Sequence, residues 1–190
     1  MNKKQEKKSI AGFSLLELLV AIGIIGIITA ISIVNLTDTK RKNIAISAQR
    51  EVASSIKLAQ NLALQGRTQS GVTPCGYGFA ALSETSYAIF YNVLNSVKPD
   101  CEEQNKDANF TKYIEGTSVT TGNVFNLPNK AKFVEHAGKS FYFSVPMGRV
   151  YGSTGTALSG PVSLEMYSES ESLSRRVTVS PGGIVDEPNN

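Results

Sequence analysis

The stretch AGFSLLELLVAIGIIGIITAISIV, residues 11–34, decides the fold of the N-terminal part of the chain. Its apolar run from Phe13 to Val34 is about 22 residues, or roughly 33 Å as an α-helix, which is long enough to cross a bilayer core. The apolar region of a secretory signal is usually about 7–15 residues, so this run is longer than a cleaved signal needs. We therefore expect a single-pass membrane helix.

The residues before the apolar run are basic. The segment MNKKQEKK sets four lysines against Glu6 and supplies much of the chain's formal net charge of +3. By the positive-inside rule the N-terminus stays in the cytoplasm and the chain after about residue 38 faces outward. Nothing downstream is basic enough for a nucleic-acid face, and there is no tryptophan for base stacking. We expect no primary nucleic-acid partner.

The helical pattern continues beyond the apolar run. Apolar and small residues recur at intervals of three and four, which places them on one stripe of a helix: Ile44, Ala48, Val52, Ile56, Ala59 and Leu62. No proline occurs before Pro74, and Gly66 is a plausible helix stop. The pattern predicts one helix from about residue 13 to 65, whose second half packs its stripe on a folded domain.

The remainder of the chain is typical of strands joined by turns. Segments 86–93, 139–145, 162–168 and 175–180 are rich in β-branched and aromatic residues, and several alternate with period two. Turn residues follow Pro99, Pro146 and Ser180, which favours antiparallel pairing. We interpret residues 95–130 as loops with weak strands, and CGYG (75–78) and SPGG (180–183) as turns. The predicted fold class is α+β: a long N-terminal helix on an antiparallel sheet domain.

Glu17 is the one acid inside the apolar run. A charged side chain at the centre of a membrane helix costs about 2.5–3.5 kcal/mol on insertion scales, and less near an end. The positive end of the helix dipole offsets only part of this cost. The nearest cation would be a terminal amine on Phe13, created if the chain were cut after Gly12.

These residues carry a family resemblance. KKSIAGFSLLELLVAIGIIGIITAI resembles the N-terminal signature of type IV pilin-like proteins, the pilins and pseudopilins: a short basic leader ending in Gly12, then Phe13, then Glu17 as the fifth residue of a long apolar helix. The resemblance implies cleavage between Gly12 and Phe13 by a prepilin peptidase, which also methylates the new terminus at Phe13. It implies that Glu17 pairs with the terminal amine of a neighbouring subunit during filament assembly.

The resemblance also implies an organisation and a set of partners. Residues 1–12 would be a cleaved leader, 13–38 a membrane and filament-core helix, 39–66 an amphipathic helix, and 67–190 an extracytoplasmic β-rich domain. The partners would be the prepilin peptidase, other pilin or pseudopilin subunits, an assembly platform protein and the lipid bilayer. The subunit would sit in the inner membrane and then in an extracytoplasmic or cell-surface filament.

The later segments are similar to one subgroup. FYFSVPMGRVYG and RRVTVSPGGIVDE resemble the closing strands of H-type minor pseudopilins of type II secretion, and CGYGFA with SYAIFYNV resembles their first strands. Many major pilins carry a proline some twenty residues into the mature helix, and this chain has none there, although Gly23 and Gly26 weaken the helix locally. A minor pilin or pseudopilin is therefore favoured, in a type IV pilus, a type II secretion system or a DNA-uptake filament.

Cys75 and Cys101 are the only cysteines. An even count in an outward-facing domain favours a disulfide, and a loop of about 25 residues would add roughly 3–3.5 kcal/mol in the chain-entropy model. Free buried thiols are the alternative. A zinc site needs four ligands, and only His136 could join the two cysteines. We expect no metal.

The remaining polar residues form no expected catalytic site. His136, the only histidine, lies beside Glu135 without a nucleophile and an orienting group in the sequence pattern, so we interpret it as a loop or strand-end residue. The acidic cluster of Asp100, Glu102, Glu103 and Asp107 lacks the glycine and spacing of an EF-hand, and we interpret it as a solvated loop. We expect no cofactor and no enzymatic activity.

Two other functions remain open. One is a membrane-anchored binding module whose sheet domain holds a ligand without forming a filament, in which case Glu17 is incidental. The other is a secreted enzyme released by signal peptidase near Ala30, which predicts a product starting around Ile31 and a catalytic cluster that the sequence does not show.

Overall fold

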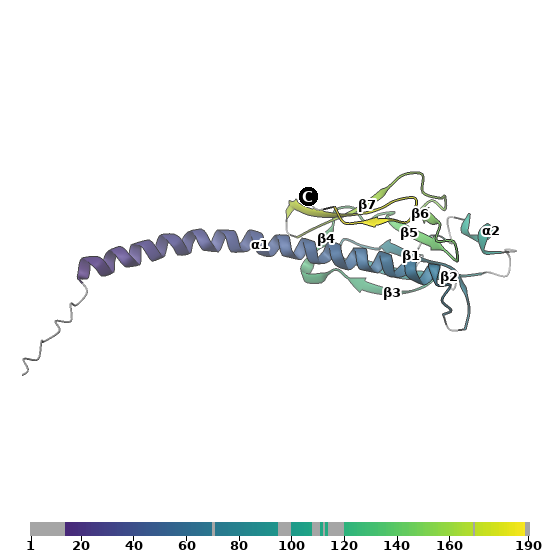
Figure 1. Cartoon of the computed structure of the whole chain (residues 1–190), viewed down its shortest axis with the longest axis horizontal. Coiled ribbons are helices and arrows are strands. Elements are labelled where there is room, and N and C mark those ends of the chain that lie inside the picture. Colours follow the sequence, from purple (N-terminus) through teal and green to yellow (C-terminus); the bar gives the residue numbers. More distant parts are fainter. Residues whose placement is uncertain are drawn as a thin grey trace, which may run out of the picture. The chain divides into compact units, whose positions relative to one another are not determined.

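The computed structural model describes residues 14–69, 71–94, 100–107, 111, 113, 120–168 and 170–188, with the side chains of residues 33–38, 120–122, 129 and 170–173 left aside. It divides the chain into two compact units, residues 1–40 and residues 41–190. We call the second the globular unit. The expected α+β class is confirmed: a long helix, α1, is followed by antiparallel sheets (Figure 1).

Helix α1 runs from Leu15 to Leu64, close to the predicted range. It ends in the motif expected of a glycine stop: Gly66 has φ +58°, its N–H donates to the Ala63 carbonyl oxygen at 3.1 Å, and the Arg67 N–H donates to the Leu62 carbonyl oxygen at 3.3 Å. This pair of bonds is a Schellman motif, which satisfies carbonyl groups that a helix end leaves open. Gly66 therefore terminates the helix, as the sequence predicts.

Two antiparallel sheets make up most of the globular unit. The five-stranded sheet has the order β3-β2-β1-β5-β6, and the four-stranded sheet has the order β4-β7-β8-β9. The strands of the first are β1 (Pro74–Ala81), β2 (Ser86–Val93), β3 (Thr120–Asn126), β5 (Ser140–Ser144) and β6 (Val150–Gly152). Those of the second are β4 (Lys132–Phe133), β7 (Val162–Ser168), β8 (Ser170–Val179) and β9 (Val185–Asp186). The short helix α2 (Cys101–Asn105) and a 3₁₀ turn, η1 (Pro128–Lys130), complete the described elements.

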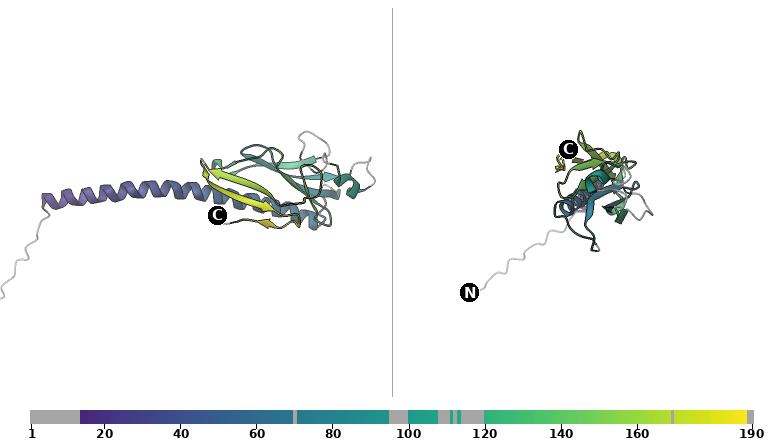
Figure 2. Two further views of the ribbon diagram at one scale, coloured as in Figure 1. Left: turned by 90° about the horizontal axis from the view of Figure 1, so that it is seen from above. Right: turned by 90° about the vertical axis from the view of Figure 1, so that its right-hand side faces the viewer.

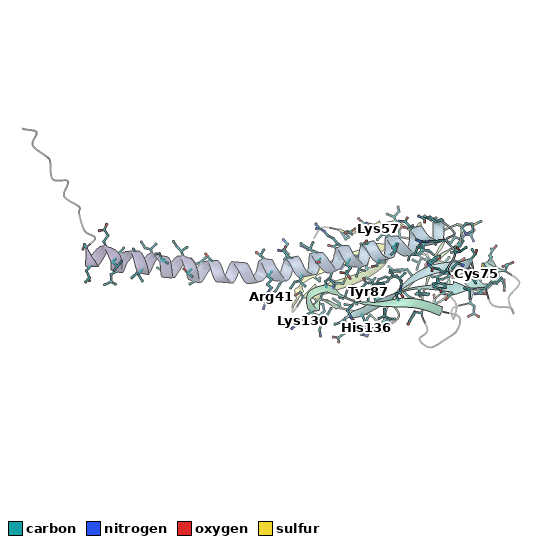
Figure 3. The ribbon with its side chains drawn as sticks, turned by 90° about the horizontal axis from the view of Figure 1, so that it is seen from below. Arg41, Lys57, Cys75, Tyr87, Lys130 and His136 are labelled. Atoms are coloured by element: carbon teal, nitrogen blue, oxygen red, sulfur yellow. A yellow bond between two sulfur atoms is a disulfide. The ribbon has the colours of Figure 1, made fainter. Side chains whose placement is uncertain are left out.

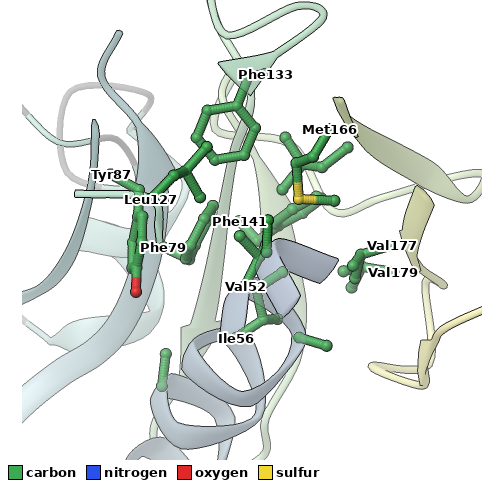
Figure 4. Close-up of a cluster of buried hydrophobic side chains, with 14 of the residues drawn as sticks. Val52, Ile56, Phe79, Tyr87, Leu127, Phe133, Phe141, Met166, Val177 and Val179 are labelled. Carbon is green, nitrogen blue, oxygen red and sulfur yellow. The ribbon is translucent and has the colours of Figure 1, made fainter. Parts of the chain in front are cut away.

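The main core lies between α1 and the two sheets. The centre of the predicted helix stripe is buried, since Ala48, Val52, Ile56 and Ala59 are fully inaccessible to solvent, and Ile44 and Leu62 at its two ends are partly buried. Figure 4 shows Val52 and Ile56 between Phe79 and Tyr87 of the first sheet and Val177 and Val179 of the second. A helix that buries one face in this way takes its stability from packing rather than from propensity.

The prediction that residues 75–78 form a turn was wrong. CGYG lies inside β1, which pairs with β2 on one side and β5 on the other. The glycines leave room for rings on the neighbouring strands: a Cβ at Gly76 would collide with the Tyr142 ring, and one at Gly78 with the Phe90 ring. Phe90 and Tyr142 form a second small core with Ala80 and Tyr151 on the face of the sheet away from the main core.

The C-terminal segment runs beside α1 (Figure 2). Gln49 Nε2 donates to the Arg176 carbonyl oxygen at 2.7 Å, and Gln60 Nε2 donates to the Gly183 carbonyl oxygen at 2.9 Å. Lys57 Nζ pairs with Glu187 Oε1 at 2.7 Å. The predicted SPGG turn is confirmed at residues 181–182, and it delivers this segment to the helix.

Candidate functional site at the N-terminal apolar helix

Ser14 caps the start of α1. The Leu16 N–H donates to Ser14 Oγ at 3.3 Å, and the Leu18 N–H donates to the Ser14 carbonyl oxygen at 3.1 Å. A serine in this position satisfies donors that the first turn of a helix cannot pair internally. Gly12 and Phe13, predicted as the cleavage junction and methylation site, lie outside the described residues. Their roles stay predictions.

Glu17 lies in the first turn of α1 and its side chain is exposed. Ser14 and Glu17 have the S-x-x-E spacing of a capping box, and a carboxylate there also faces the positive end of the helix dipole. Within the part of the chain that the structure describes, Glu17 has no ion-pair partner. The predicted pairing with a neighbouring subunit stays a prediction.

The apolar run forms a helical surface without cover. Leu15–Ser32 has a mean hydropathy of 2.5, and none of this window is buried inside the protein. It is the one described helix long and apolar enough to cross a membrane. Its large side chains are exposed on all sides, as Leu15 at 80%, Ile22 at 61% and Ile31 at 61% illustrate. A helix that is apolar all round needs lipid or other protein around it.

The hydroxyl groups of this window are satisfied within the helix. Thr29 Oγ1 donates to the Ile25 carbonyl oxygen at 2.7 Å, and Ser32 Oγ donates to the Ile28 carbonyl oxygen at 2.8 Å. Backbone and side-chain polar groups at membrane depth have to pair internally, because lipid offers no partners. Within Leu15–Ser32 this leaves Glu17 as the only ionisable side chain.

The predicted disulfide is present. Cys75 in β1 and Cys101 at the start of α2 are bridged, with 5.1 Å between their Cα atoms and a sequence separation of 26. Figure 3 marks Cys75 at one end of the globular unit, where Figure 1 also places α2. The bridge therefore ties a short helix to a strand of the five-stranded sheet.

The acidic cluster is partly structural. Asp100 caps α2, because its Oδ1 accepts a hydrogen bond from the Glu103 N–H at 2.8 Å, and Glu103 Oε2 pairs with Lys106 Nζ at 3.2 Å. The expected solvated loop is therefore a capped helical turn between Cys101 and Asn105. The pairing raises the pKa of Lys106 above its usual value.

His136 lies in the segment between β4 and β5, beside Glu135, whose Oε2 pairs with Lys139 Nζ at 3.2 Å. Among the described residues, no group of three or more His, Cys, Asp and Glu side chains is placed to hold a metal ion.

A hydrogen-bond network that the sequence analysis missed joins α1 to the five-stranded sheet. The Tyr87 hydroxyl donates to Glu51 Oε1 at 2.9 Å and lies 3.1 Å from Ser55 Oγ (Figure 3 marks Tyr87). Burial is the main cause that raises the pKa of Tyr87 to about 12. Glu51 and Ser55 are four residues apart and so share a helix face, which is the only signal that the sequence offered.

The comparisons with known proteins bear on the N-terminus. Residues 7–33 match the model of the prokaryotic N-terminal methylation motif, which covers the predicted leader end, the Gly12–Phe13 junction and Glu17. No curated protein and no solved structure matches the chain. A motif of this kind points to a structural subunit of the pilin type. The match supports a type IV pilin-like protein with a prepilin-type N-terminal signature.

Proposed function

We propose that the chain is a minor pilin or pseudopilin, a structural subunit of a type IV pilus-like or type II secretion filament. It is inserted in the inner membrane by α1 with its N-terminus inside. A prepilin peptidase cleaves it between Gly12 and Phe13 and methylates Phe13. An assembly platform protein then passes the subunit into the filament, where its α1 packs against the helices of other subunits.

One observation carries the proposal: Glu17 is the lone ionisable side chain in the apolar window Leu15–Ser32. The two hydroxyl groups of the window are bonded within the helix, so they need no outside partner. The charge of Glu17 is offset within the helix only by the dipole at the first turn. Placing a charged carboxylate in the lipid costs up to about 2.5–3.5 kcal/mol of insertion free energy. A cation from outside the helix would remove that cost.

Cleavage supplies the cation. Removing residues 1–12 takes away the four lysines of the leader and leaves a terminal amine on Phe13, at the edge of the apolar run. Methylation keeps that amine basic and charged. The amine of one subunit and Glu17 of its neighbour can then neutralise each other in an environment of low dielectric constant, where the attraction is strong. The same pair would set the register between adjacent helices.

Processing is tested by expressing the full chain with and without an active prepilin peptidase and sequencing its N-terminus. The expected product begins at Phe13, with a methylated amine, only when the peptidase is active. A control chain with Gly12→Leu should stay uncut, because a bulky side chain would obstruct the scissile bond. A chain that still begins at Met1 beside a processed control pilin would exclude the proposed maturation.

Assembly is tested with Glu17→Gln in cells that carry the matching filament machinery. The variant is nearly the same size but cannot form the ion pair, so we expect it to be cleaved and inserted yet absent from sheared filament fractions. Thr29→Val is the matched control, since it removes a polar group of the same window that is already satisfied internally. A simple membrane-anchored binding module would tolerate both substitutions, and incorporation of Glu17→Gln at the normal level would refute the filament role assigned to this residue.

A further inference from the structure

A small pocket lies in the globular unit between α2 and the β5–β6 connection. Its volume is about 180 Å³, below the roughly 300–1,000 Å³ of pockets that take drug-sized molecules, so its ligand would be of single-residue size. Glu102 and Asn105 of α2 line one side. The other side is lined by residues of β5, β6 and the turn between them: Ser144, Val145, Pro146, Met147, Arg149 and Tyr151.

Both sides of this pocket are anchored on one residue, Cys75. Its Sγ is bonded to Cys101, the first residue of α2. Its carbonyl oxygen accepts a hydrogen bond from Asn105 Nδ2 at 3.3 Å and another from the Val145 N–H at 3.0 Å. The disulfide and these two bonds fix α2 and the turn against the same point of β1. The pocket is thus held in shape before any ligand arrives, which lowers the entropic cost of binding.

The position of Arg149 is also fixed by its backbone. The Arg149 N–H donates to Ser144 Oγ at 3.1 Å, and the Ser144 N–H donates to the Arg149 carbonyl oxygen at 3.0 Å. These bonds close the tight turn between β5 and β6. Arg149, which lines the pocket, is therefore held on a rigid stretch of backbone.

The pocket carries two opposite charges that do not pair with each other. Glu102 and Arg149 both line it, and neither forms an ion pair with any residue that the structure describes. Elsewhere in the globular unit exposed charges do pair, as Lys132 with Glu84 at 2.7 Å and Lys106 with Glu103 at 3.2 Å. A small ligand with one anionic and one cationic group could bridge them.

Asn105 adds an open hydrogen-bond acceptor. Asn105 is only 2% exposed. Its Nδ2 donates to the Cys75 carbonyl oxygen, whereas its Oδ1 has no hydrogen-bond partner among the described residues. A buried acceptor without a partner costs about 1–3 kcal/mol. An N–H donor of a ligand in the pocket would recover part of this cost with a small shift of the amide.

We propose that this pocket binds an α-amino acid with an apolar side chain, in its zwitterionic form. The carboxylate pairs with the Arg149 guanidinium, which offers a planar fork of donors for that group. The ammonium pairs with Glu102 and donates to Asn105 Oδ1. The apolar side chain packs on Val145, Pro146 and Met147, whose side chain is 74% exposed without a ligand. This site lies outside the N-terminal motif, and it does not depend on the filament role.

The test uses the full chain in detergent micelles and three probes: L-leucine, N-acetyl-L-leucine and L-leucine methyl ester. Binding is followed by saturation-transfer difference NMR and titrated to a dissociation constant. L-leucine should bind. The N-acetyl compound lacks the ammonium and the ester lacks the carboxylate, so each should bind at least tenfold more weakly.

Variants assign the contacts. Arg149→Gln and Glu102→Gln should each weaken L-leucine binding at least tenfold, and both side chains are exposed, so folding should be preserved. Glu103→Gln is the matched control on the neighbouring residue of α2, which does not line the pocket, and it should leave the dissociation constant within twofold. Absence of L-leucine binding, equal binding of the N-acetyl compound, or unchanged binding in Arg149→Gln would overturn the proposal.

Discussion

Replacing Gly78 by alanine should destabilise the protein, although the same change usually stabilises a chain. At positions where the backbone suits both residues, glycine-to-alanine gains about 0.4–1 kcal/mol, because the unfolded chain has fewer conformations to lose. Gly78 lies in the middle of β1 with an ordinary strand backbone, and on that ground alone it would follow this rule.

Packing around Gly78 makes the effect of the alanine destabilising instead. A Cβ at Gly78 would overlap the Phe90 ring and lie 2.9 Å from the Phe141 carbonyl oxygen, which belongs to the neighbouring strand and cannot move freely. Phe90 is fully buried, with rings of Tyr113 and Tyr142 at 5.9 and 6.1 Å between centroids, so it has no free space to enter. Overpacking of this kind costs about 1–3 kcal/mol. We expect Gly78→Ala to lower the free energy of unfolding by that amount.

The assay is urea unfolding of the full chain in detergent, with the disulfide oxidised. Gly182→Ala is the control, since a Cβ there would touch only Ser180 Oγ at 3.9 Å, and its free energy of unfolding should stay within about 0.5 kcal/mol. Phe90→Leu lacks the ring atoms that meet the new methyl group, so the double variant should show a favourable coupling of about 0.5–3 kcal/mol. A Gly78→Ala protein as stable as the parent, or a double variant without coupling, would refute this account of β1.

Three further predictions concern other contacts of the globular unit. Cys101→Ser should lower the free energy of unfolding by about 3.5 kcal/mol, the chain-entropy value for a loop of this length, and reducing agent should then have no further effect on the variant. The pKa of Tyr87 rises to about 12 on folding, so the stability that its protonated hydroxyl contributes is complete below pH 10 and should be lost between pH 10 and 12. Tyr87→Phe should flatten that part of the curve of unfolding free energy against pH, measured by circular dichroism. Ile56→Ala should cost about 2–5 kcal/mol in the same unfolding assay, whereas Leu58→Ala, at a side chain 49% exposed, should cost far less.

The helix of this fold could be predicted well from the sequence because its signals are local. The spacing of Val52 and Ile56 marked the buried face, and Gly66 marked the end. The alternation of Leu164 and Met166 likewise marked the buried face of β7. In each case the residues that decide the structure lie within a few positions of one another.

The errors arose where distant residues decide. Glycines at 76 and 78 suggest a turn, and only the rings of Phe90 and Tyr142 on adjacent strands explain them as strand residues. Helix α2 is too short to show periodicity, and it depends on the Asp100 cap and the Cys101 bridge. β8 begins at Ser170, five residues before the predicted start. The pattern of residues along the chain does not indicate which strands become neighbours in the sheet.

The functional sites differ in the same way: one is marked by residues close together in the sequence, and the other is formed by residues far apart in it. Glu17 could be identified from sequence because a lone acid in an apolar run is visible at once, and the methylation motif rests on the same short window. The pocket beside Cys75 could not be identified, because Glu102 and Arg149 lie far apart in the chain and come together only through the disulfide and the turn after β5.

The order of strands has a consequence for how crowded copies of this protein would behave. Among the described elements, three of the four outermost strands, β4, β6 and β9, are only two or three residues long, so they offer little backbone to an incoming chain. β3 is seven residues long, and it presents Val124 and Phe125 at 56% and 40% exposure. At high local concentration, unwanted pairing between copies should therefore begin at β3, the longest edge strand described. Val124→Lys would place a charge on this edge and should reduce the pairing.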